Sequence, residues 1–428
     1  MDSKRVLVFP CGSEIALEIY RSVSKSIHFD LIGASSVDDH GKFVYENYIS
    51  GVPFVNDSSF LVKIKEIVKT NQIDAIYPAM DSVIDILKSN EDFVGCKIIA
   101  SNPETTKICL SKKRTYSVFK NVLSVPKLYE SSASVKSYPV FSKPDVGYGS
   151  RGAKLCHNKT ELDAQLNRVE NLIICEYLPG AEYTVDCFTN SEGTLLYASP
   201  RERLRIMNGI SVNTKPVYQD VEEFISIAST INSKIRFRGA WFFQVKRDIN
   251  NELVLLEIAS RFGGSSSLCR AKGVNFALMS LYDAFNIPVS IIENDYAVEM
   301  DRALDNKYII DLSYDEVFVD FDDCLYLESK KINPELIEFL FRCLNKGIKL
   351  TLLSKHDDEK SGDFYELLSR WRISQLFDRI IHVKPDEEKF IYIDNVNSIF
   401  IDDSFSERKK IKEHCGINVF SVDMVGCL

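Results

Sequence analysis

A glutamate interrupts an apolar run in the stretch Leu255-Leu-Glu-Ile-Ala-Ser-Arg-Phe-Gly-Gly264. The run has the composition of a buried strand, and a similar run, Trp241-Phe-Phe-Gln244, precedes it. An unpaired buried charge is costly, so Glu257 requires a partner. Mg²⁺ carrying nucleotide phosphates would be such a partner, with Gln244 as a further oxygen ligand. An ion pair between Glu257 and Arg261 is the structural alternative.

A glycine-rich loop lies upstream, in Phe141-Ser-Lys-Pro-Asp-Val-Gly-Tyr-Gly-Ser-Arg-Gly152. It places Lys143 at the end of a predicted strand. The backbone N–H groups of such a loop bind phosphate oxygens, and a lysine adds a positive charge. The loop is not a P-loop, because no Gly-Lys-Ser/Thr ends it. Taken alone, it is equally consistent with a simple turn.

A third motif, Cys175-Glu-Tyr-Leu-Pro-Gly-Ala-Glu-Tyr-Thr-Val-Asp186, lies between these two. In order and spacing the three motifs resemble the ATP-grasp superfamily, in the branch of the carbamoyl-phosphate synthetase large subunit and the carboxylate–amine ligases. The resemblance covers residues 1–312 and implies ATP and Mg²⁺, or Mn²⁺, as cofactors. It assigns the nucleotide and its phosphates to Lys113, Lys143, Arg203 and the Ser150 loop, adenine to Glu176, Tyr177 and Leu178, ribose to Glu182, Mg²⁺ to Gln244 and Glu257, and the transferred phosphoryl group to Arg261.

The metal motif departs from the usual pattern of this superfamily at one position. The usual motif reads Glu-x-Asn-Pro-Arg, whereas this chain has Glu257-Ile-Ala-Ser-Arg261. Ala259 has no side-chain oxygen. The resemblance therefore implies a second Mg²⁺ that loses one ligand or takes water in its place, while Glu257 bridges the two ions.

Three arginines alternate along Pro200-Arg-Glu-Arg-Leu-Arg-Ile-Met-Asn-Gly209. On a strand, Arg201, Arg203 and Arg205 share one face. We expect them to bind a triphosphate or a substrate carboxylate, since the segment lies where the superfamily places its triphosphate arginine. A solvated basic face is the alternative.

The alternation of short apolar runs with helical patterns changes along the chain. It predicts a small doubly wound parallel-sheet domain first, because continuous apolar strands indicate a sheet covered on both faces. Antiparallel strands follow, and a second strand–helix alternation comes last. The predicted domains are a pre-ATP-grasp α/β domain over 1–110, an α+β ATP-grasp domain with antiparallel sheets over 111–312, and a second doubly wound domain over 313–428, with the charged stretch 292–311 as the connection.

Paired aspartates follow two buried-type strands of the last domain. Asp320 and Asp322 come at the end of Val317-Phe-Val-Asp-Phe-Asp-Asp-Cys-Leu325, and Ile399-Phe-Ile-Asp-Asp403 ends a later strand. Carboxyl ends of parallel strands border the crevice in which α/β sheets bind ligands. Four converging carboxylates would repel one another unless a divalent cation lay among them.

These residues resemble the haloacid dehalogenase superfamily, mostly phosphatases, over 313–428, with intervals too short for a cap domain. The implied fold is a capless haloacid dehalogenase-like Rossmannoid domain. The implied roles are Asp320 as nucleophile, Asp322 as general acid and base, Ser354 as phosphoryl ligand, Lys389 or, second, Lys384 as neutralising cation, and Asp320, Asp322, Asp402 and Asp403 as Mg²⁺ ligands. Cys324 stands where the superfamily usually has threonine.

Composition restricts the class of protein. The chain has 428 residues, 45% hydrophobic and 26% charged, with a net charge of −9. The negative charge disfavours a broad nucleic-acid surface. No apolar run reaches the length of a membrane span, and the first residues are too short for a signal peptide. Eleven scattered cysteines without a Cys-x-x-Cys pair favour reduced thiols and a cytoplasmic location.

The sequence thus favours an ATP-dependent carboxylate–amine ligase that forms an acyl phosphate, fused to a phosphatase-like domain. The expected partners are ATP, a carboxylate, an amine and a phosphorylated small molecule or glycan precursor, with a homodimer as the assumed assembly. One alternative is a small-molecule phosphotransferase. The other is a nucleotide-responsive, non-catalytic module that regulates the phosphatase, which Ala259 would permit. Asp81 and His40 are read as turn residues in preference to substrate contacts.

Overall fold

The computed structural model describes residues 3–147, 149, 151–303, 305, 308, 310–327 and 330–428. The chain divides into two compact units, residues 1–305 and 306–428. Each unit contains its own sheets and its own hydrophobic cores. No helix among the described residues is both long and apolar enough to cross a membrane.

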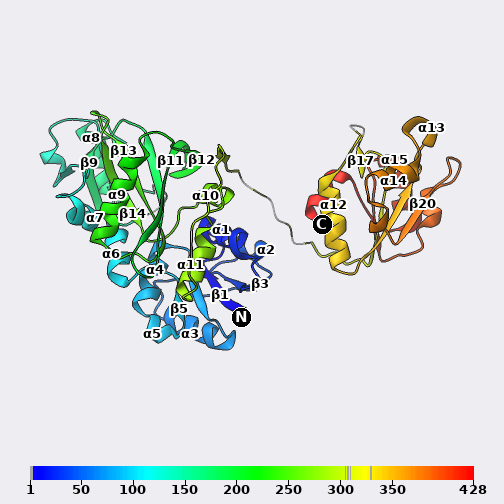
Figure 1. The fold of residues 1–428 in the computed structure, drawn as a ribbon, viewed down its shortest axis with the longest axis horizontal. Helices are drawn as coiled ribbons and strands as arrows, with labels where there is room; N and C mark the ends of the chain where they lie inside the picture. The colour runs from blue at the N-terminus through cyan, green and yellow to red at the C-terminus, as the bar shows by residue number, and fades with distance from the viewer. Residues whose placement is uncertain are drawn as a thin grey trace. The chain divides into compact units, whose positions relative to one another are not determined.

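The first unit begins with a five-stranded parallel sheet in the order β3-β2-β1-β4-β5 (Figure 1). Its strands are β1 Lys4–Phe9, β2 Phe29–Ala34, β3 Asn47–Ile49, β4 Ala75–Pro78 and β5 Lys97–Ile98. Apolar residues cover both faces, as the continuous apolar strands predict. On one face Ile19 of α1 (Glu14–Val23) joins the core, and on the other Ile64 of α3 (Phe60–Thr70) and Val83 of α4 (Asp81–Ser89) do so.

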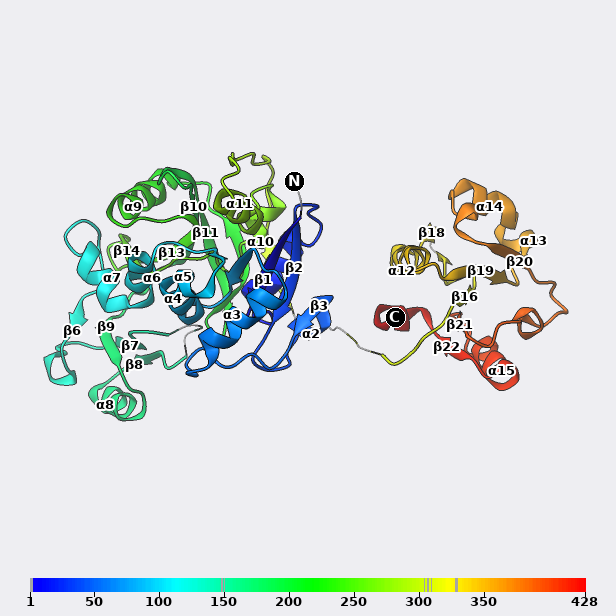
Figure 2. The ribbon, with the colours of Figure 1, turned by 90° about the horizontal axis from the view of Figure 1, so that it is seen from below.

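A six-stranded antiparallel sheet follows, in the order β14-β13-β10-β11-β12-β15. Its strands are β10 Glu182–Thr189, β11 Leu195–Met207, β12 Ile210–Pro216, β13 Gly239–Arg247, β14 Leu253–Ala259 and β15 Met300–Asp301. Helix α9 (Val221–Lys234) packs along β10 and β11 (Figure 2). Phe224 of α9 shares a core with Trp241 and Phe243, which accounts for two of the three aromatic residues in succession on β13.

A smaller sheet, β6-β9-β7-β8, carries the glycine-rich loop between two of its strands. The strands are β6 Leu128–Tyr129, β7 Val140–Pro144, β8 Lys154–Cys156 and β9 Leu172–Glu176, and α8 (Lys159–Arg168) covers them. The other helices of the unit are α2 Gly41–Val44, α5 Glu91–Val94, α6 Pro103–Leu110, α7 Lys112–Phe119, α10 Ser267–Ala271 and α11 Phe276–Ala284.

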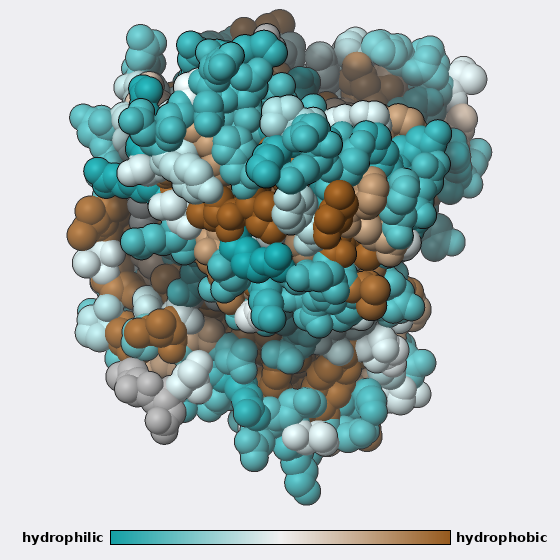
Figure 3. Space-filling model, turned by 90° about the vertical axis from the view of Figure 1, so that its right-hand side faces the viewer, coloured by the Kyte–Doolittle hydropathy of each residue, from teal (hydrophilic) through white to brown (hydrophobic). Residues whose placement is uncertain are grey.

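The second unit is a five-stranded parallel sheet in the order β20-β19-β16-β21-β22. Its strands are β16 Glu316–Val319, β19 Lys349–Ser354, β20 Arg379–His382, β21 Ser398–Ile401 and β22 Asn418–Phe420, with a hairpin of β17 Tyr326–Leu327 and β18 Lys331–Ile332. Helices α12 (Pro334–Asn345) and α14 (Phe364–Arg370) pack on one face and α15 (Phe405–Cys415) on the other, while α13 (Asp358–Ser361) follows β19. On the face drawn in Figure 3, hydrophobic residues lie in separate groups among hydrophilic ones.

One difference from the expected organisation concerns the charged stretch 292–311. It was predicted to be the connection between domains, yet Met300 and Asp301 form β15 and pair with Thr214 and Asn213 of β12. Arg302 also contacts Glu14 of α1. The middle of this stretch is therefore an edge of the large sheet, and the division between the units falls after residue 305.

Candidate nucleotide and phosphoryl-transfer sites

One row of cross-strand neighbours forms the floor of the first site. Glu257 of β14 lies opposite Gln244 of β13, Gln244 lies opposite Thr184 of β10, and Thr184 lies opposite Arg201 of β11. Directly opposed residues share a face of the sheet. The predicted metal ligands Gln244 and Glu257 are therefore neighbours, and their oxygens fit a hard divalent cation.

Two lysines face this floor. Lys112, the first residue of α7, lies with its Nζ 4.0 Å from Glu257 Oε2, and Lys143 Nζ donates to the Leu256 carbonyl at 3.3 Å. Burial lowers the pKa of Lys112, a shift that Lys143 reinforces and Glu257 opposes. Two cations beside one carboxylate suit a phosphate chain that brings negative charge with it.

Three hollows meet at this point. A cavity of about 140 Å³ is lined by Lys112, Lys143 and Glu182, and a second, of about 230 Å³, by Asp81 and Ala259. A third, of about 450 Å³, extends to the N-terminus of α1. Glu257 and Gly149 line all three. The arrangement offers adjoining spaces for a nucleotide and a second substrate next to one carboxylate.

The predicted arginines differ in their surroundings. Arg203 donates to Glu182, to Gln244 Oε1 at 2.8 Å and to the Gly209 carbonyl at 2.8 Å, so it lies within the site. Arg201 is buried against Asp186, with Nε 2.6 Å from Oδ2. Arg205 is exposed and pairs with Asp301. All three are paired with acids, which differs from a free basic face.

Arg261 does not form the expected alternative ion pair with Glu257. Its Nε and Nη2 contact Asp81 Oδ1 and Oδ2 at 2.9 and 2.7 Å. Asp81 is the first residue of α4, and it lines the hollow of about 450 Å³ together with Arg261. Reading Asp81 as a simple turn residue is therefore wrong, because its carboxylate holds the arginine assigned to the phosphoryl group.

Several other predicted nucleotide residues lie near the edge of the site. Lys113 is exposed and lines a separate hollow with Tyr129, because consecutive helical residues point in different directions. Glu176 is the last residue of β9, and its Oε1 accepts from the Lys127 N–H at 2.8 Å. Tyr177 follows the strand, and Leu178 is buried. Ser150 lies outside the described residues. These assignments stay predictions.

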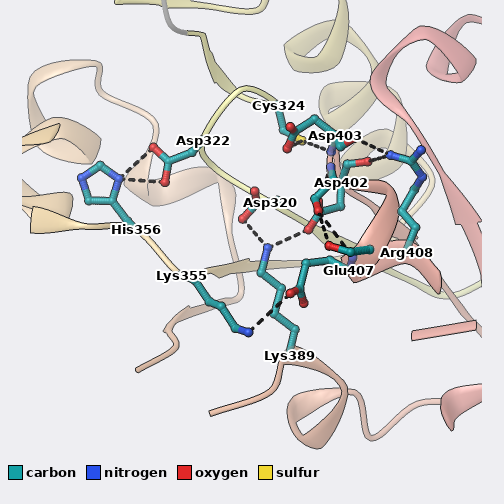
Figure 4. A network of polar contacts seen from close by, with 12 residues as sticks. Asp320, Asp322, Cys324, Lys355, His356, Lys389, Asp402, Asp403, Glu407 and Arg408 are labelled. Atoms are coloured by element: carbon teal, nitrogen blue, oxygen red, sulfur yellow. Dashed lines mark hydrogen bonds and ion pairs between the residues drawn. The ribbon is translucent and has the colours of Figure 1, made fainter. Parts of the chain in front are cut away.

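In the second unit a lysine lies between two carboxylates that follow the ends of β16 and β21 (Figure 4). Lys389 Nζ lies 2.7 Å from Asp320 Oδ1 and 2.6 Å from Asp402 Oδ2, and all three side chains are buried. Burial alone would lower the pKa of Lys389, but the two carboxylates outweigh it and raise that pKa. Lys384 is exposed and pairs with Glu387 at 3.5 Å. The geometry thus favours Lys389 over Lys384 as the neutralising cation.

A donor group for a metal ion lies beside this lysine. Carboxylate oxygens of Asp320 and Asp403 lie within 4.8 Å of each other and of the Cys324 Sγ. Two carboxylates fit Mg²⁺, which prefers oxygen ligands. The Cys324 Sγ accepts from the Asp403 N–H at 3.0 Å, so the thiol orients this turn. Asp402 is held by Lys389 and the Ser404 N–H, which distinguishes it from Asp403.

The remaining predicted residues of this centre come from adjacent strand ends. Ser354 ends β19, and its buried hydroxyl lies beside Asp320. Asp322 is bound by His356, whose Nδ1 lies 2.8 and 2.9 Å from the two carboxylate oxygens. Arg408 donates to the carbonyls of Asp402 and Asp403 at 2.6 and 2.7 Å.

Sequence reasoning missed Lys112, His356 and Arg408. The sequence analysis chose Lys113 instead of Lys112. The helical period from Thr115 and Tyr116, which are both buried, indicates that Lys112 is the lysine that faces inward. His356 follows Ser354 by two residues, and on an extended segment that spacing places both on one side. No sequence signal identifies Arg408, because its acceptors are backbone carbonyls.

Comparison with known proteins supports the assignment of the first unit. Residues 168–309 match the family model described as ATP-grasp in the biosynthetic pathway with Ter operon. The D-alanine–D-alanine ligase of Fusobacterium nucleatum is 26% identical over 158 residues, which are 35% of this chain and 55% of that protein. The chain thus spans about half the length of this relative.

Solved structures show the same fold. The biotin carboxylase domain of Hydrogenobacter thermophilus 2-oxoglutarate carboxylase, in complex with MgADP, ADP and bicarbonate, gives a TM-score of 0.57 at 16% identity, covering 69% of this chain and 72% of that chain. The L-amino acid ligase of Bacillus licheniformis gives 0.55 at 15% identity, covering 68% and 76%. The first unit therefore has the ATP-grasp fold, and the predicted resemblance to that superfamily is confirmed.

Proposed function

We propose that residues 1–305 form an ATP-dependent ligase that joins a carboxylate to an amine through an acyl phosphate. The observation that carries the proposal is the meeting of three hollows at Glu257, which Lys112, Lys143 and Arg261 also line. The fold shared with ligases adds support.

In the proposed reaction a substrate carboxylate oxygen attacks the γ-phosphorus of ATP, and the bond to ADP breaks. Lys112 and Lys143 hold the phosphates, while Arg261, oriented by Asp81, balances the charge on the transferred group. The amine nitrogen then attacks the acyl carbon, loses a proton and expels phosphate. Mg²⁺, or Mn²⁺, held by Gln244 and Glu257, would neutralise phosphate charge when bound.

The test is ADP release from ATP and Mg²⁺ with pools of carboxylates and amines. It is run in an Asp320→Asn background, so that the second unit releases no phosphate. Release that needs both a carboxylate and an amine supports the ligase. Glu257→Gln should lower it at least about a hundredfold, because a charged ligand is lost, whereas Glu252→Gln, an exposed acid at the start of the same segment, should not.

Two other outcomes would replace the ligase. ADP release with one substrate alone indicates a small-molecule phosphotransferase. ATP binding without ADP release from any pool, together with an ATP-dependent rate of phosphate-ester hydrolysis, indicates a non-catalytic module that regulates the second unit.

For residues 306–428 we propose Mg²⁺-dependent hydrolysis of a phosphate monoester, such as a phosphorylated small molecule or glycan precursor. The specific observation is the Asp320–Lys389–Asp402 arrangement with the buried Ser354 hydroxyl beside Asp320. Asp320 would attack phosphorus to form an aspartyl phosphate, and Asp322 would protonate the leaving oxygen and then activate water. Mg²⁺ held by Asp320 and Asp403 would neutralise the phosphoryl oxygens when bound.

Hydrolysis of p-nitrophenyl phosphate by the full chain tests this second proposal. Asp320→Asn should abolish it, and Asp394→Asn, an exposed aspartate paired with Arg379, should leave it unchanged. Activity that survives in Asp320→Asn contradicts the assigned nucleophile. Absence of hydrolysis in the unaltered chain with Mg²⁺ and with Mn²⁺ contradicts the proposed activity.

A further inference from the structure

His356 is a buried histidine whose ring nitrogens contact two separate segments. Its side chain is fully buried. Nδ1 lies 2.8 and 2.9 Å from the two oxygens of Asp322, and Nε2 lies 2.7 Å from the Gly362 carbonyl oxygen. A carbonyl oxygen only accepts, so Nε2 carries a hydrogen. The Gly362 carbonyl therefore holds the ring at Nε2, and Nδ1 contacts both oxygens of the Asp322 carboxyl group. This contact of Nδ1 is called the clamp.

The surroundings of His356 prevent its ring from turning. Phe321 and Phe364 pack against it, each with ring centroids 5.5 Å away. His382 Nε2 lies 2.8 Å from the His356 carbonyl oxygen and fixes the backbone there. Because the imidazole is held on all sides, the position of its Nδ1 is set by the packed core and not by the reacting groups.

Among the residues that the structure describes, no other side chain bonds to the Asp322 carboxylate. Its side chain is 38% exposed, and Figure 4 shows its carboxylate turned towards His356 while Asp320 lies against Lys389. A half-exposed aspartate without a fixed partner would sample several rotamers. The clamp on both oxygens selects one orientation for the group assigned as general acid.

We propose that His356 is a positioning residue for Asp322 and that it suits the second unit to phosphate esters of aliphatic alcohols. This inference rests on the proposed phosphohydrolase function. When the Asp320–phosphorus bond forms and the bond from phosphorus to the alcohol oxygen breaks, the alkoxide takes the proton that Asp322 shares with Nδ1 of His356, and Asp322 is left as a carboxylate. An alkoxide is a poor leaving group and needs that proton in the transition state, whereas p-nitrophenolate leaves without it.

The test compares two esters on the full chain. His356→Ala should lower kcat/KM for glycerol 3-phosphate on the order of a hundredfold, which is the usual contribution of a general acid. For p-nitrophenyl phosphate the loss should stay below about threefold. His356→Asn places an amide nitrogen near the position of Nδ1, so it should recover most of the lost rate. His414→Ala is the control, since His414 is an exposed histidine of α15 that contacts the Lys410 carbonyl.

The outcomes separate the inference from the function on which it rests. Equal losses on both esters, in a variant that unfolds at the usual temperature, overturn the positioning role. If the unaltered chain hydrolyses neither ester, the phosphohydrolase proposal fails. The contact between His356 and Asp322 is then tested by the ¹⁵N resonances of the His356 ring. These should shift in Asp322→Asn and not in Asp394→Asn. The absence of a shift in Asp322→Asn overturns the inference.

Discussion

At the scale of single residues, adjacent lysines of α7 give the sharpest contrast. Lys112 is nearly buried beside Glu257, and Lys113 is exposed. A charge-assisted contact to phosphate contributes more than a solvated charge does. We expect Lys112→Ala to raise the Kd for ATP with Mg²⁺ at least about tenfold, and Lys113→Ala less than about threefold. Titration calorimetry measures both, and the reverse order would return the assignment to Lys113.

The lysines of the second unit give a contrast in stability. Lys389→Met leaves the carboxylates of Asp320 and Asp402 buried without a cation, which should lower the free energy of unfolding by about 3–5 kcal/mol. Lys384→Met removes an exposed pair and should change it by less than about 0.5 kcal/mol.

Urea unfolding in EDTA measures this difference, and its pH dependence has a definite sign. Without Lys389 the folded carboxyl pKa values rise further above their unfolded values. The folded state then gains stability on protonation and loses it as pH rises. The deficit of Lys389→Met should be largest near pH 7 and smaller near pH 4. A deficit that does not change with pH would contradict the pairing.

The candidate sites were predictable where a strand fixes the side-chain direction. Gln244 and Glu257, or Asp320 and Asp402, lie on or just after strands whose apolar pattern defines the core face, so the sequence indicates which residues meet. Partners brought in from distant elements were not predictable. Asp81 reaches Arg261 across 180 positions of the chain, and no periodicity encodes that contact.

At the scale of elements, the N-cap of α12 is a clear sequence signal with a measurable effect. Asn333 Oδ1 accepts from the N–H groups of Glu335 and Leu336 at 3.1 and 3.3 Å, and Pro334 occupies the first turn. Asn333→Ala should lower the free energy of unfolding of this unit by about 1 kcal/mol. Denaturant titration followed by far-UV circular dichroism measures it. Asn333→Ser, which keeps a capping oxygen, should recover part of the loss, while both variants lose the Nδ2 bond to the Cys324 carbonyl. Equal losses in both variants would assign the effect to that bond and not to the cap.

Strands and helices were predicted best where the core alone determines them. The apolar runs of β1, β4, β16 and β21 are buried in the structure as their sequences indicate. β15 was missed because it is two residues long and its sequence is charged. An edge strand of this kind is held by backbone pairing with β12 and by Arg302, and neither contact leaves an apolar pattern.

At the scale of the whole molecule, the cores predict two independent unfolding transitions. The described core residues fall into clusters that belong wholly to residues 1–305 or wholly to residues 306–428. Units that share no core cluster unfold as separate cooperative units, and the clusters within one unit pack on its common sheets. With roughly 0.7 kcal/mol per residue near 60 °C, the unfolding enthalpies should be about 210 and about 85 kcal/mol.

Capping variants decide which calorimetric peak belongs to which unit. Asn333→Ala should lower only the temperature of the smaller peak, because α12 packs in the second unit. Asn158 caps α8 of the first unit by accepting from the Glu161 N–H at 3.0 Å. Asn158→Ala should therefore lower only the temperature of the larger peak. Magnesium and ATP should raise the larger peak, since a ligand stabilises the unit that binds it. If either substitution moved both peaks equally, the units would be thermodynamically coupled, and the ligase and phosphatase assays could not be interpreted as properties of separate units.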